Sequence, residues 1–527
     1  MASPRSAADS TMEIPERSRR EIIGGTAGLM IVLLLASLDN AIVGPALPTV
    51  VGELGGLAHL SWVLTGYTLA AAVSAPLWGK LGDLFGRKGV FLSSLGLFLA
   101  GSALTGASQN MAELIAFRTV QGLGAGGLTV GTLAILGELL PPAERAKYQG
   151  YFATVMPVAI IGGPLIGGWF TDNLSWRWAF YINLPLGAVA LVITWTTLQL
   201  GARAGRTRID WGGAGVLTVW TSALVLLGGW AGSTYAWGSW QILVLAGIAL
   251  VGLAVFIAVE RRAVEPVLPL HVFGNRNFAL AGVLSFLGGL MMLGSAAYLP
   301  QFQQLVQGMS ATASGLLLLP MVLPMVATGV LVGQVSSRTG HVRSYPIIGG
   351  VLLTAGMVLL ARVGVDTSRL FLSLVMVLLG IGLGCLAQPS TLIAQNSLEL
   401  RDMGAGMGAN TFLRAMGMSL GTAVLGTIYA GRLHDTMSAQ AGTDGARIVA
   451  GGHSISPAAV TNLPPALRDA LRVAVTHGIV GVFTGCAVAA AATLLAACGL
   501  RNVPLRRRVR ASERPAAAVP AQPEAAG

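Results

Sequence analysis

The sequence predicts an all-α protein that crosses a membrane many times. Of its 527 residues, 54% are hydrophobic and only 10% are charged, and the mean hydropathy is +0.71. A soluble domain carries about 25% charged residues. The apolar residues also form many runs about as long as the ~20 residues that a helix needs to cross the hydrocarbon core. Lipid is therefore the expected solvent, and a disordered or disulfide-stapled chain is excluded.

Reading these runs in order predicts fourteen spans. The first span follows a polar tail, residues 1–22. It is too long for the apolar region of a secretory signal and ends without a cleavage site, so we expect it to be retained. The predicted spans are 23–47, 60–79, 89–107, 111–136, 148–171, 177–198, 211–230, 239–259, 277–299, 312–334, 345–362, 370–393, 404–430 and 473–499.

The distribution of positive charge predicts the orientation. Most of the 33 Lys and Arg residues fall in segments on the same side as the N-terminus. Such an excess marks the cytoplasmic side. Both termini are therefore expected in the cytoplasm, and the membrane is expected to be a bacterial inner (plasma) membrane. The net charge of +11 fits contact with anionic lipid rather than with nucleic acid.

Two turns predict an internal repeat. Gly79 and Gly86, after the second span, match Gly333 and Gly340, after the tenth, at the same spacing of seven residues. Transporters are often built from such repeats, with the binding site between them. The segments that follow are an N-terminal six-helix bundle (23–200), a linker with two extra helices (201–262), a C-terminal six-helix bundle (263–500) containing an outer loop (431–472), and a basic, then disordered, cytosolic tail (501–527).

Charged residues inside spans are the strongest candidates for function, because an unpaired charge in hydrocarbon is costly. At ~1.5 Å per residue, Asp39 in the first span and Arg118 in the fourth lie at similar depths, so we expect them to pair. An arginine favours the charged form of a carboxyl group and burial favours the neutral form. The pair could therefore couple to protons or be a static ion pair. Arg414 has no evident acidic partner, and carbonyl groups, water or an anionic substrate are its alternative ligands.

The fifth span combines glycine and proline. Pro164 removes a backbone donor, and Gly163, Gly167 and Gly168 allow helices to approach closely. Tight packing and a hinge are both compatible with this spacing.

Metals, cofactors and catalysis are not expected. Cys385, Cys486 and Cys498 are odd in number and lie in apolar runs without a C-x-x-C pair. The chain has no P-loop, which argues against an ATP-driven pump, and no nucleophile or metal constellation of an enzyme.

Six motifs, in order along the chain, resemble the major facilitator superfamily and in particular its fourteen-helix drug:proton antiporters. They are LDNAIVGPALP (38–48), GKLGDLFGRK (79–88), RTVQGLG (118–124), GPLIGG (163–168), WRWAFYINLP (176–185), and PVLPL (266–270) with FGNR (273–276).

The resemblance implies the major facilitator fold, with two six-helix bundles that rock about a central cavity and two extra linking transmembrane helices. It implies that Asp39 and Arg118 couple transport to protons and that the GPLIGG segment marks export. It also implies a cytosolic latch made of Gly79, Asp83, Gly86, Arg87 and Lys88. The second turn has Ser337 in place of Asp83, so only one strong latch is expected.

The expected function is efflux of amphipathic drugs in exchange for protons, by a monomer in contact with membrane lipids. Export of an endogenous lipid or metabolite by the same fold is the alternative. Apolar, aromatic and amide groups suit a broad binding cavity, although plain helix packing explains the ninth-span residues as well. The cavity candidates are Asn40, Met291, Met292, Tyr298, Gln301, Gln304 and Arg414.

Overall fold

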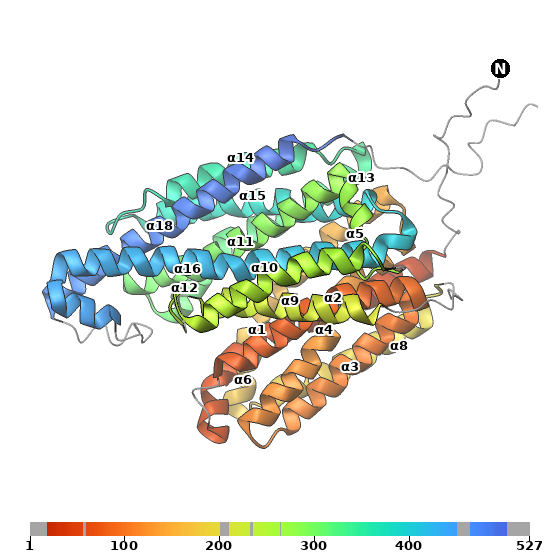
Figure 1. The fold of residues 1–527 in the computed structure, drawn as a ribbon, viewed down its shortest axis with the longest axis horizontal. Helices are drawn as coiled ribbons and strands as arrows, with labels where there is room; N and C mark the ends of the chain where they lie inside the picture. The colour runs from red at the N-terminus through yellow and green to blue at the C-terminus, as the bar shows by residue number, and fades with distance from the viewer. Residues whose placement is uncertain are drawn as a thin grey trace, which may run out of the picture.

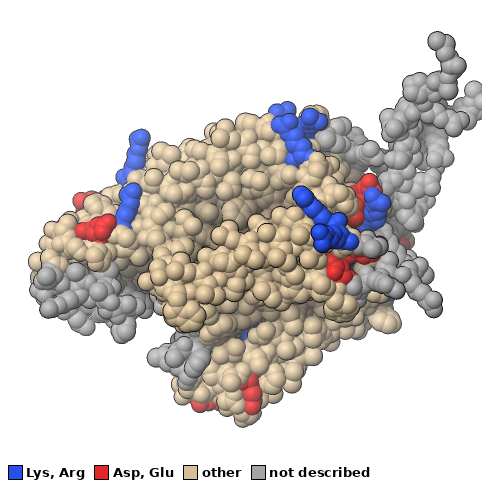
Figure 2. Space-filling view, in the orientation of Figure 1, with Lys and Arg blue, Asp and Glu red and all other residues tan. Residues whose placement is uncertain are grey.

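The computed structural model is helical and describes residues 18–55, 60–200, 210–231, 235–263, 265–450 and 464–502. The expectations for the tail 1–17, the basic linker 201–209 and the C-terminal tail from 503 lie outside the described residues. Figure 2 shows charged side chains gathered at the two ends of the molecule, with a broad uncharged band between them. Such a band is the surface that a bilayer would cover.

The N-terminal bundle contains eight helical segments. They are α1 (Arg19–Leu54), α2 (Leu60–Phe85), α3 (Arg87–Ala107), α4 (Met111–Leu139), α5 (Pro142–Phe152), α6 (Val155–Asn173), α7 (Trp178–Tyr181) and α8 (Asn183–Thr197).

The C-terminal bundle follows a pair of long helices, α9 (Trp211–Trp230) and α10 (Trp240–Glu260). Its segments are η2 (Leu270–Gly274), α11 (Arg276–Leu305), α12 (Ala311–Leu316), α13 (Leu319–Thr339), α14 (Ser344–Leu360), α15 (Arg369–Asn396), η3 (Leu400–Asp402), α16 (Met403–Ala450) and α18 (Pro465–Cys498).

Every predicted span falls on these helices, and three of the spans cover two consecutive segments each. Within the described residues, eleven helices are long and apolar enough to cross a membrane. The remaining three predicted spans fall on α2, on α5 with α6, and on the shorter apolar helix α14. The protein is therefore a multi-pass membrane protein, and the count of fourteen crossings stays a prediction.

Three spans that we predicted as continuous are broken, and proline accounts for each break. A proline cannot donate to the carbonyl four residues earlier. Pro157 thus leaves Ala153 without its helical bond, between α5 and α6. Pro185 likewise removes the donor for the carbonyl of Tyr181, the last residue of α7. Pro320 does the same for Leu316, the last residue of α12.

The predicted outer loop 431–472 is helical at both of its ends. Helix α16 continues to Ala450, with non-helical backbone at Gly442, and α18 already begins at Pro465. Leu433, Met437 and Leu471 are buried in the hydrophobic core. An apolar stripe on otherwise polar turns therefore holds both helices together beyond the predicted spans, whereas residues 451–463 lie outside the described residues.

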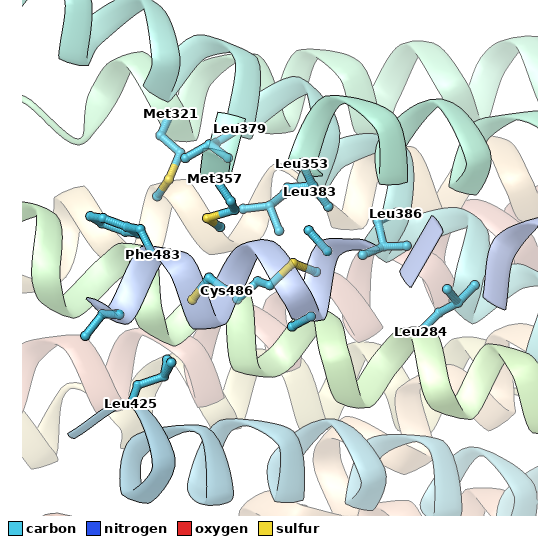
Figure 3. Close-up of a cluster of buried hydrophobic side chains, with 14 of the residues drawn as sticks. Leu284, Met321, Leu353, Met357, Leu379, Leu383, Leu386, Leu425, Phe483 and Cys486 are labelled. Carbon is cyan, nitrogen blue, oxygen red and sulfur yellow. The ribbon is translucent and has the colours of Figure 1, made fainter. Parts of the chain in front are cut away.

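Each bundle has its own apolar core. In the N-terminal bundle, Leu35, Phe98 and Leu128 belong to one buried cluster. In the C-terminal bundle, Phe483 and Cys486 of α18 belong to one buried cluster with Met357, Leu379 and Leu383, which lie on the neighbouring helices above α18 in Figure 3. The second cluster also includes residues of the N-terminal bundle, such as Ala75 and Val130.

The two bundles meet at one end. Figure 1 shows α2, α5 and α13 together at the right of the view, whereas the far ends of α1 and α6 lie well apart from the far end of α16. Without side chains at Gly79 and Gly404, the backbones of α2 and α16 touch: a Cβ on Gly79 would clash with the Gly404 carbonyl. A Cβ on Gly333 of α13 would likewise lie 2.5 Å from the Ala146 carbonyl of α5. The glycines of the repeat thus mark two equivalent crossing points.

Helix α9 lies against both bundles on one flank, and α10 packs on α9. Trp230 of α9 packs edge-on against Trp62 of α2, with ring centroids 5.5 Å apart. On the other side, the Ser419 hydroxyl of α16 donates to the Val225 carbonyl of α9 at 3.3 Å, where Gly228 permits the close approach. The extra pair therefore bridges α2 and α16.

Candidate functional site

The predicted pairing of Asp39 with Arg118 is confirmed. The Arg118 Nη1 group donates to Asp39 Oδ2 at 2.6 Å, and both side chains are fully buried. The pair lies inside the N-terminal bundle, between α1 and α4, and faces neither solvent nor lipid. Because a lone buried charge would be strongly destabilising, each group depends on the other.

Uncharged polar side chains complete the site, and we did not assign them from the sequence. Gln121 Nε2 and Asn183 Nδ2 both donate to Asp39 Oδ1, at 2.8 and 2.7 Å. Gln121 Oε1 in turn accepts from Arg118 Nη1 at 2.9 Å, and Asn183 also donates to Ser102 Oγ. Gln121 stands one turn after Arg118 in a glycine-rich helix, and this spacing is the signal that could have found it.

Arg118 also lies between two aromatic rings. Its guanidinium carbon is 4.2 Å from the centroid of the Tyr67 ring and 5.5 Å from that of Phe180. Its Nε and Nη2 groups have no hydrogen-bond partner among the described residues. The Arg118 charge therefore depends on one carboxylate and two ring faces. Adding a proton to Asp39 would remove the negative charge that holds α1 to α4 and α8.

The glycines of the GPLIGG segment hold α6 tightly against α1, next to this pair. A Cβ on Gly163 would clash with Ala41, and one on Gly167 would clash with the Ile42 carbonyl. By contrast, Gly168 has no neighbour within 4 Å, and Pro164 is exposed on α6. At two of the three glycines the geometry is that of tight packing.

Asp83 joins the two bundles through the start of α16. Its carboxylate accepts hydrogen bonds from the backbone N–H groups of Gly404 at 3.0 Å and Ala405 at 2.8 Å. These are among the N-terminal amides of α16, where a helix lacks internal acceptors and favours a negative charge. The carboxylate of one bundle thus caps a helix of the other.

Arg87 fixes Asp83 in this position. Its Nη2 group donates to Asp83 at 2.9 Å and to the Leu400 carbonyl of the C-terminal bundle at 2.5 Å. Its Nη1 group donates to Glu138 of α4 at 2.9 Å. One buried guanidinium therefore connects α2, α4 and the C-terminal bundle.

Two residues of the predicted latch, Gly86 and Lys88, are not part of the contact that Asp83 and Arg87 make with the C-terminal bundle. The turn between α2 and α3 is only one residue, Gly86, whose φ of 95° suits glycine. Lys88 does not reach the C-terminal bundle: it donates to the Trp195 carbonyl of α8 at 2.7 Å. Its ammonium group is on the far side of α3, so Lys88 anchors α3 within its own bundle.

A second polar contact between the bundles was not predicted. Gln149 of α5 donates to Gln395 of α15 at 2.7 Å, and Gln395 donates to the Leu133 carbonyl of α4 at 3.0 Å. Both glutamines are buried. This contact accompanies the crossing of α5 and α13, where the Ser337 hydroxyl donates to the Gln334 carbonyl within α13.

The cavity candidates of the ninth span do not share one environment. Met291 is fully buried in the C-terminal core and cannot line a cavity in this arrangement, whereas Met292 is partly exposed. Adjacent residues on a helix point about 100° apart. Gln301 donates to the Tyr429 hydroxyl at 3.0 Å, and Gln304 donates to Ser314 at 2.8 Å.

Tyr298, Asn40 and Arg414 complete the set. The Tyr298 ring packs against that of Tyr429, with centroids 5.4 Å apart. Asn40 is exposed, although its neighbour Asp39 is buried. Arg414 is exposed on the α16 face between the residues packed on α11 and those packed on α2, and its guanidinium has no partner among the described residues.

Comparisons with known proteins agree with this architecture. The family model described as the Major Facilitator Superfamily matches residues 29–422. The chain is 37% identical over 413 residues, which are 78% of this chain and 76% of the relative, to the multidrug transporter protein MdtP of Bacillus subtilis. It is 37% identical over 422 residues (79% and 82%) to multidrug resistance protein 3 of the same organism. It is also 40% identical over 492 residues (92% and 70%) to an uncharacterized MFS-type transporter of Mycobacterium tuberculosis.

Solved structures show the same fold at low sequence identity. The human organic anion transporter MFSD10 aligns with a TM-score of 0.59 at 17% identity, covering 89% of this chain and 99% of that one. The proton:xylose symporter XylE aligns with a TM-score of 0.56 at 13% identity, covering 89% and 94%. The family match, the relatives and the fold agree, and the chain belongs to the major facilitator superfamily, whose members are membrane transporters of small molecules and not enzymes.

Proposed function

We propose that this protein exports amphipathic drugs in exchange for protons. The observation that carries the proposal is the fully buried Asp39–Arg118 pair, in which the carboxylate holds α1 to α4 and α8. The names of the two Bacillus subtilis relatives support drugs as the substrate class. Inward movement of each proton would supply about 2.3 kcal/mol per 100 mV of membrane potential.

The geometry suggests how a proton at Asp39 would alter substrate binding. A neutral Asp39 accepts more weakly from Arg118, Gln121 and Asn183, so α1 becomes free to shift against α4. Asn40, the next residue on α1, is exposed. The protonation state is thus one residue away from a cavity candidate, and proton and drug compete through the movement of α1.

Alternating access would use the end at which the bundles meet. With Asp83 on the α16 amides and Gln149 on Gln395, this end is closed. We propose that it is the cytoplasmic end, that both chain termini lie in the cytoplasm, and that the inner membrane holds the protein as a monomer surrounded by lipid. Opening would break these contacts and expose the cavity to cytoplasmic drug.

The decisive experiment replaces Asp39 with asparagine. Proteoliposomes with the native protein should accumulate the cationic dye ethidium when a proton gradient is applied, and ethidium addition should move protons. Asp39→Asn should bind ethidium and exchange it across the membrane without a gradient, yet lose gradient-driven accumulation. The matched control is Asp172→Asn, because Asp172 is exposed at the end of α6. Accumulation by Asp39→Asn at the native rate would overturn proton coupling through this site.

Arg414 favours a second candidate, export of an anionic amphiphile such as a lipid. An unpaired cation on an inner helix face attracts a carboxylate or phosphate group. If so, Arg414→Gln should weaken the binding of an anionic fluorescent fatty acid about tenfold, the loss expected for one charge-assisted hydrogen bond. Ethidium binding should not weaken. Equal effects on both probes would assign Arg414 a structural role.

A further inference from the structure

A pair of acidic side chains lies outside the site described above, on the extra helices α9 and α10. Asp210 caps α9, with its Oδ1 atom accepting from Gly213 N at 2.8 Å, and Glu260 is the last residue of α10. A Cβ on Gly213 would clash with Asp210 Oδ2 and lie 3.2 Å from Glu260 Oε1. The two carboxyl groups therefore converge on the space that this glycine leaves open.

Both groups have an oxygen without a partner. Glu260 is only 3% exposed, and its carboxyl group accepts from the backbone of the segment that covers it, from Leu268 N at 3.3 Å and from Val267 N. Glu260 Oε2 and Asp210 Oδ2 have no hydrogen-bond partner among the described residues. A buried carboxylate with so few donors is strongly disfavoured as an anion.

Within the described part of the chain, no cation forms an ion pair with Glu260. Asp210 and Lys80 are the described charged groups whose fields reach it. Lys80 forms its ion pair elsewhere, with Glu265 at 2.6 Å. Two carboxyl groups in close proximity resist simultaneous ionisation, and a shared proton relieves the repulsion.

We propose that Glu260 and Asp210 form a second proton-binding site, in which the pair holds one proton, carried by the more buried Glu260. The proton comes from water at the end where the bundles meet and returns there. This site is separate from Asp39 and does not depend on the proposed drug substrate.

The site is connected to the contact between the bundles. The segment 265–268 covers Glu260 and also carries Glu265, the partner of Lys80. Lys80 follows Gly79, the glycine on which α16 rests, and precedes Asp83 by three residues. Glu260 retains its proton more strongly while this segment covers it than when opening exposes its carboxyl group to water. Acidification at this end should therefore favour the closed arrangement, and alkaline conditions should favour opening.

The first test detects the proton directly. Infrared difference spectra of the full-length protein in lipid nanodiscs, recorded while the pH is varied, should contain a band of a protonated carboxyl group that Glu260→Gln removes. Asp210→Asn should keep the band but move its midpoint about one pH unit lower, because it removes the neighbouring negative charge. The control Glu144→Gln, an exposed acid at the start of α5, should leave the band unchanged.

The second test measures the arrangement of the bundles. Spin labels at Ile23→Cys and His341→Cys, exposed residues of the two bundles at this end, report their separation in a Cys498→Ser background. The native protein should become more closed as the pH falls, and Glu260→Gln should lose this part of the pH response and remain closed.

The proposal is wrong if Glu260→Gln keeps the native carboxyl band, or if its label distances follow pH as the native ones do. A band that responds to sodium instead of pH would identify a cation site and also overturn it. Ethidium transport by Asp39→Asn is independent of these spectra, so the failure of either proposal can be distinguished from failure of the other.

Discussion

At Asp39, one carboxylate determines how three helices are held. Its two oxygens accept from Arg118, Gln121 and Asn183, which come from α4 and α8, while α1 provides the acid. A charge change at this position therefore alters contacts that are spread across the N-terminal bundle.

A second carboxylate, Glu53 at the opposite end of the molecule, should make the stability of the protein depend on pH. It accepts from Arg177 Nη1 at 2.5 Å and from Trp176 Nε1 at 2.6 Å. The hydrogen bonds from Arg177 and Trp176 lower the pKa of Glu53. Since the folded protein favours the ionised form, this contribution to stability is complete above the ordinary glutamate value of 4.5 and is lost as the pH falls through the lowered pKa.

Melting temperatures in detergent would check this. Glu53→Gln should melt below the native protein at neutral pH, and the difference should shrink in acid. Asp172→Asn, an exposed acid at the same end, should show no such convergence. A difference that persists unchanged at low pH would contradict the assignment to Glu53.

Sequence reasoning identified the charged pair but not its neutral partners. Asp39 and Arg118 were evident because a charge inside an apolar run is rare and costly. A neutral polar side chain costs little free energy in a membrane helix and occurs at many positions. Residue type alone therefore did not single out Gln121, Asn183 and Ser102. Met291 and Met292 could not be separated either, because the direction of a residue in a uniformly apolar helix is set by packing.

On the scale of elements, small residues decide where helices cross. Gly79 allows the backbone of α2 to touch α16, and Gly333 does the same for α13 and α5. We expect Gly79→Ala to destabilise the closed arrangement by about 1–3 kcal/mol, the usual cost of overpacking. The label pair at Ile23 and His341 should then report a more open end.

The matched control is Gly89→Ala on α3, because a Cβ on Gly89 meets nothing within 4 Å. That variant should keep the native distances. If Gly79→Ala also keeps them, the glycine contact does not determine the arrangement of the bundles.

Helix limits were the least predictable feature of the elements. Hydropathy located each span but did not show the breaks caused by Pro157, Pro185 and Pro320, since proline also occurs within continuous helices such as α2, at Pro76. It also missed the turns of α16 beyond residue 430. Their sequence is polar on average, and only Leu433 and Met437 mark the buried side.

On the scale of the whole molecule, the two bundles were predictable from the Gly79 and Gly333 repeat, whereas the contact between Gln149 and Gln395 was not. That contact joins residues 246 positions apart, and neither glutamine lies in a repeated motif.

This contact offers a test of rocking. Cysteines at both positions, in the Cys498→Ser background, should form a disulfide that holds the bundles closed and stops ethidium transport. Reductant should restore transport, and either single cysteine should transport throughout. Full activity of the oxidised protein would mean that this end need not open.

The bridge formed by α9 has a consequence for molecules dissolved in the bilayer. Along one seam, α9 spans from Trp62 on α2 to Ser419 on α16 and walls off the junction of the bundles from lipid. The opposite seam, where α5 crosses α13, has no such wall among the described helices. In the present arrangement the backbones of α5 and α13 touch at Gly333 and close that seam too. Were the bundles to separate as proposed, an apolar solute in the bilayer would gain access along this flank and not along the flank that α9 covers.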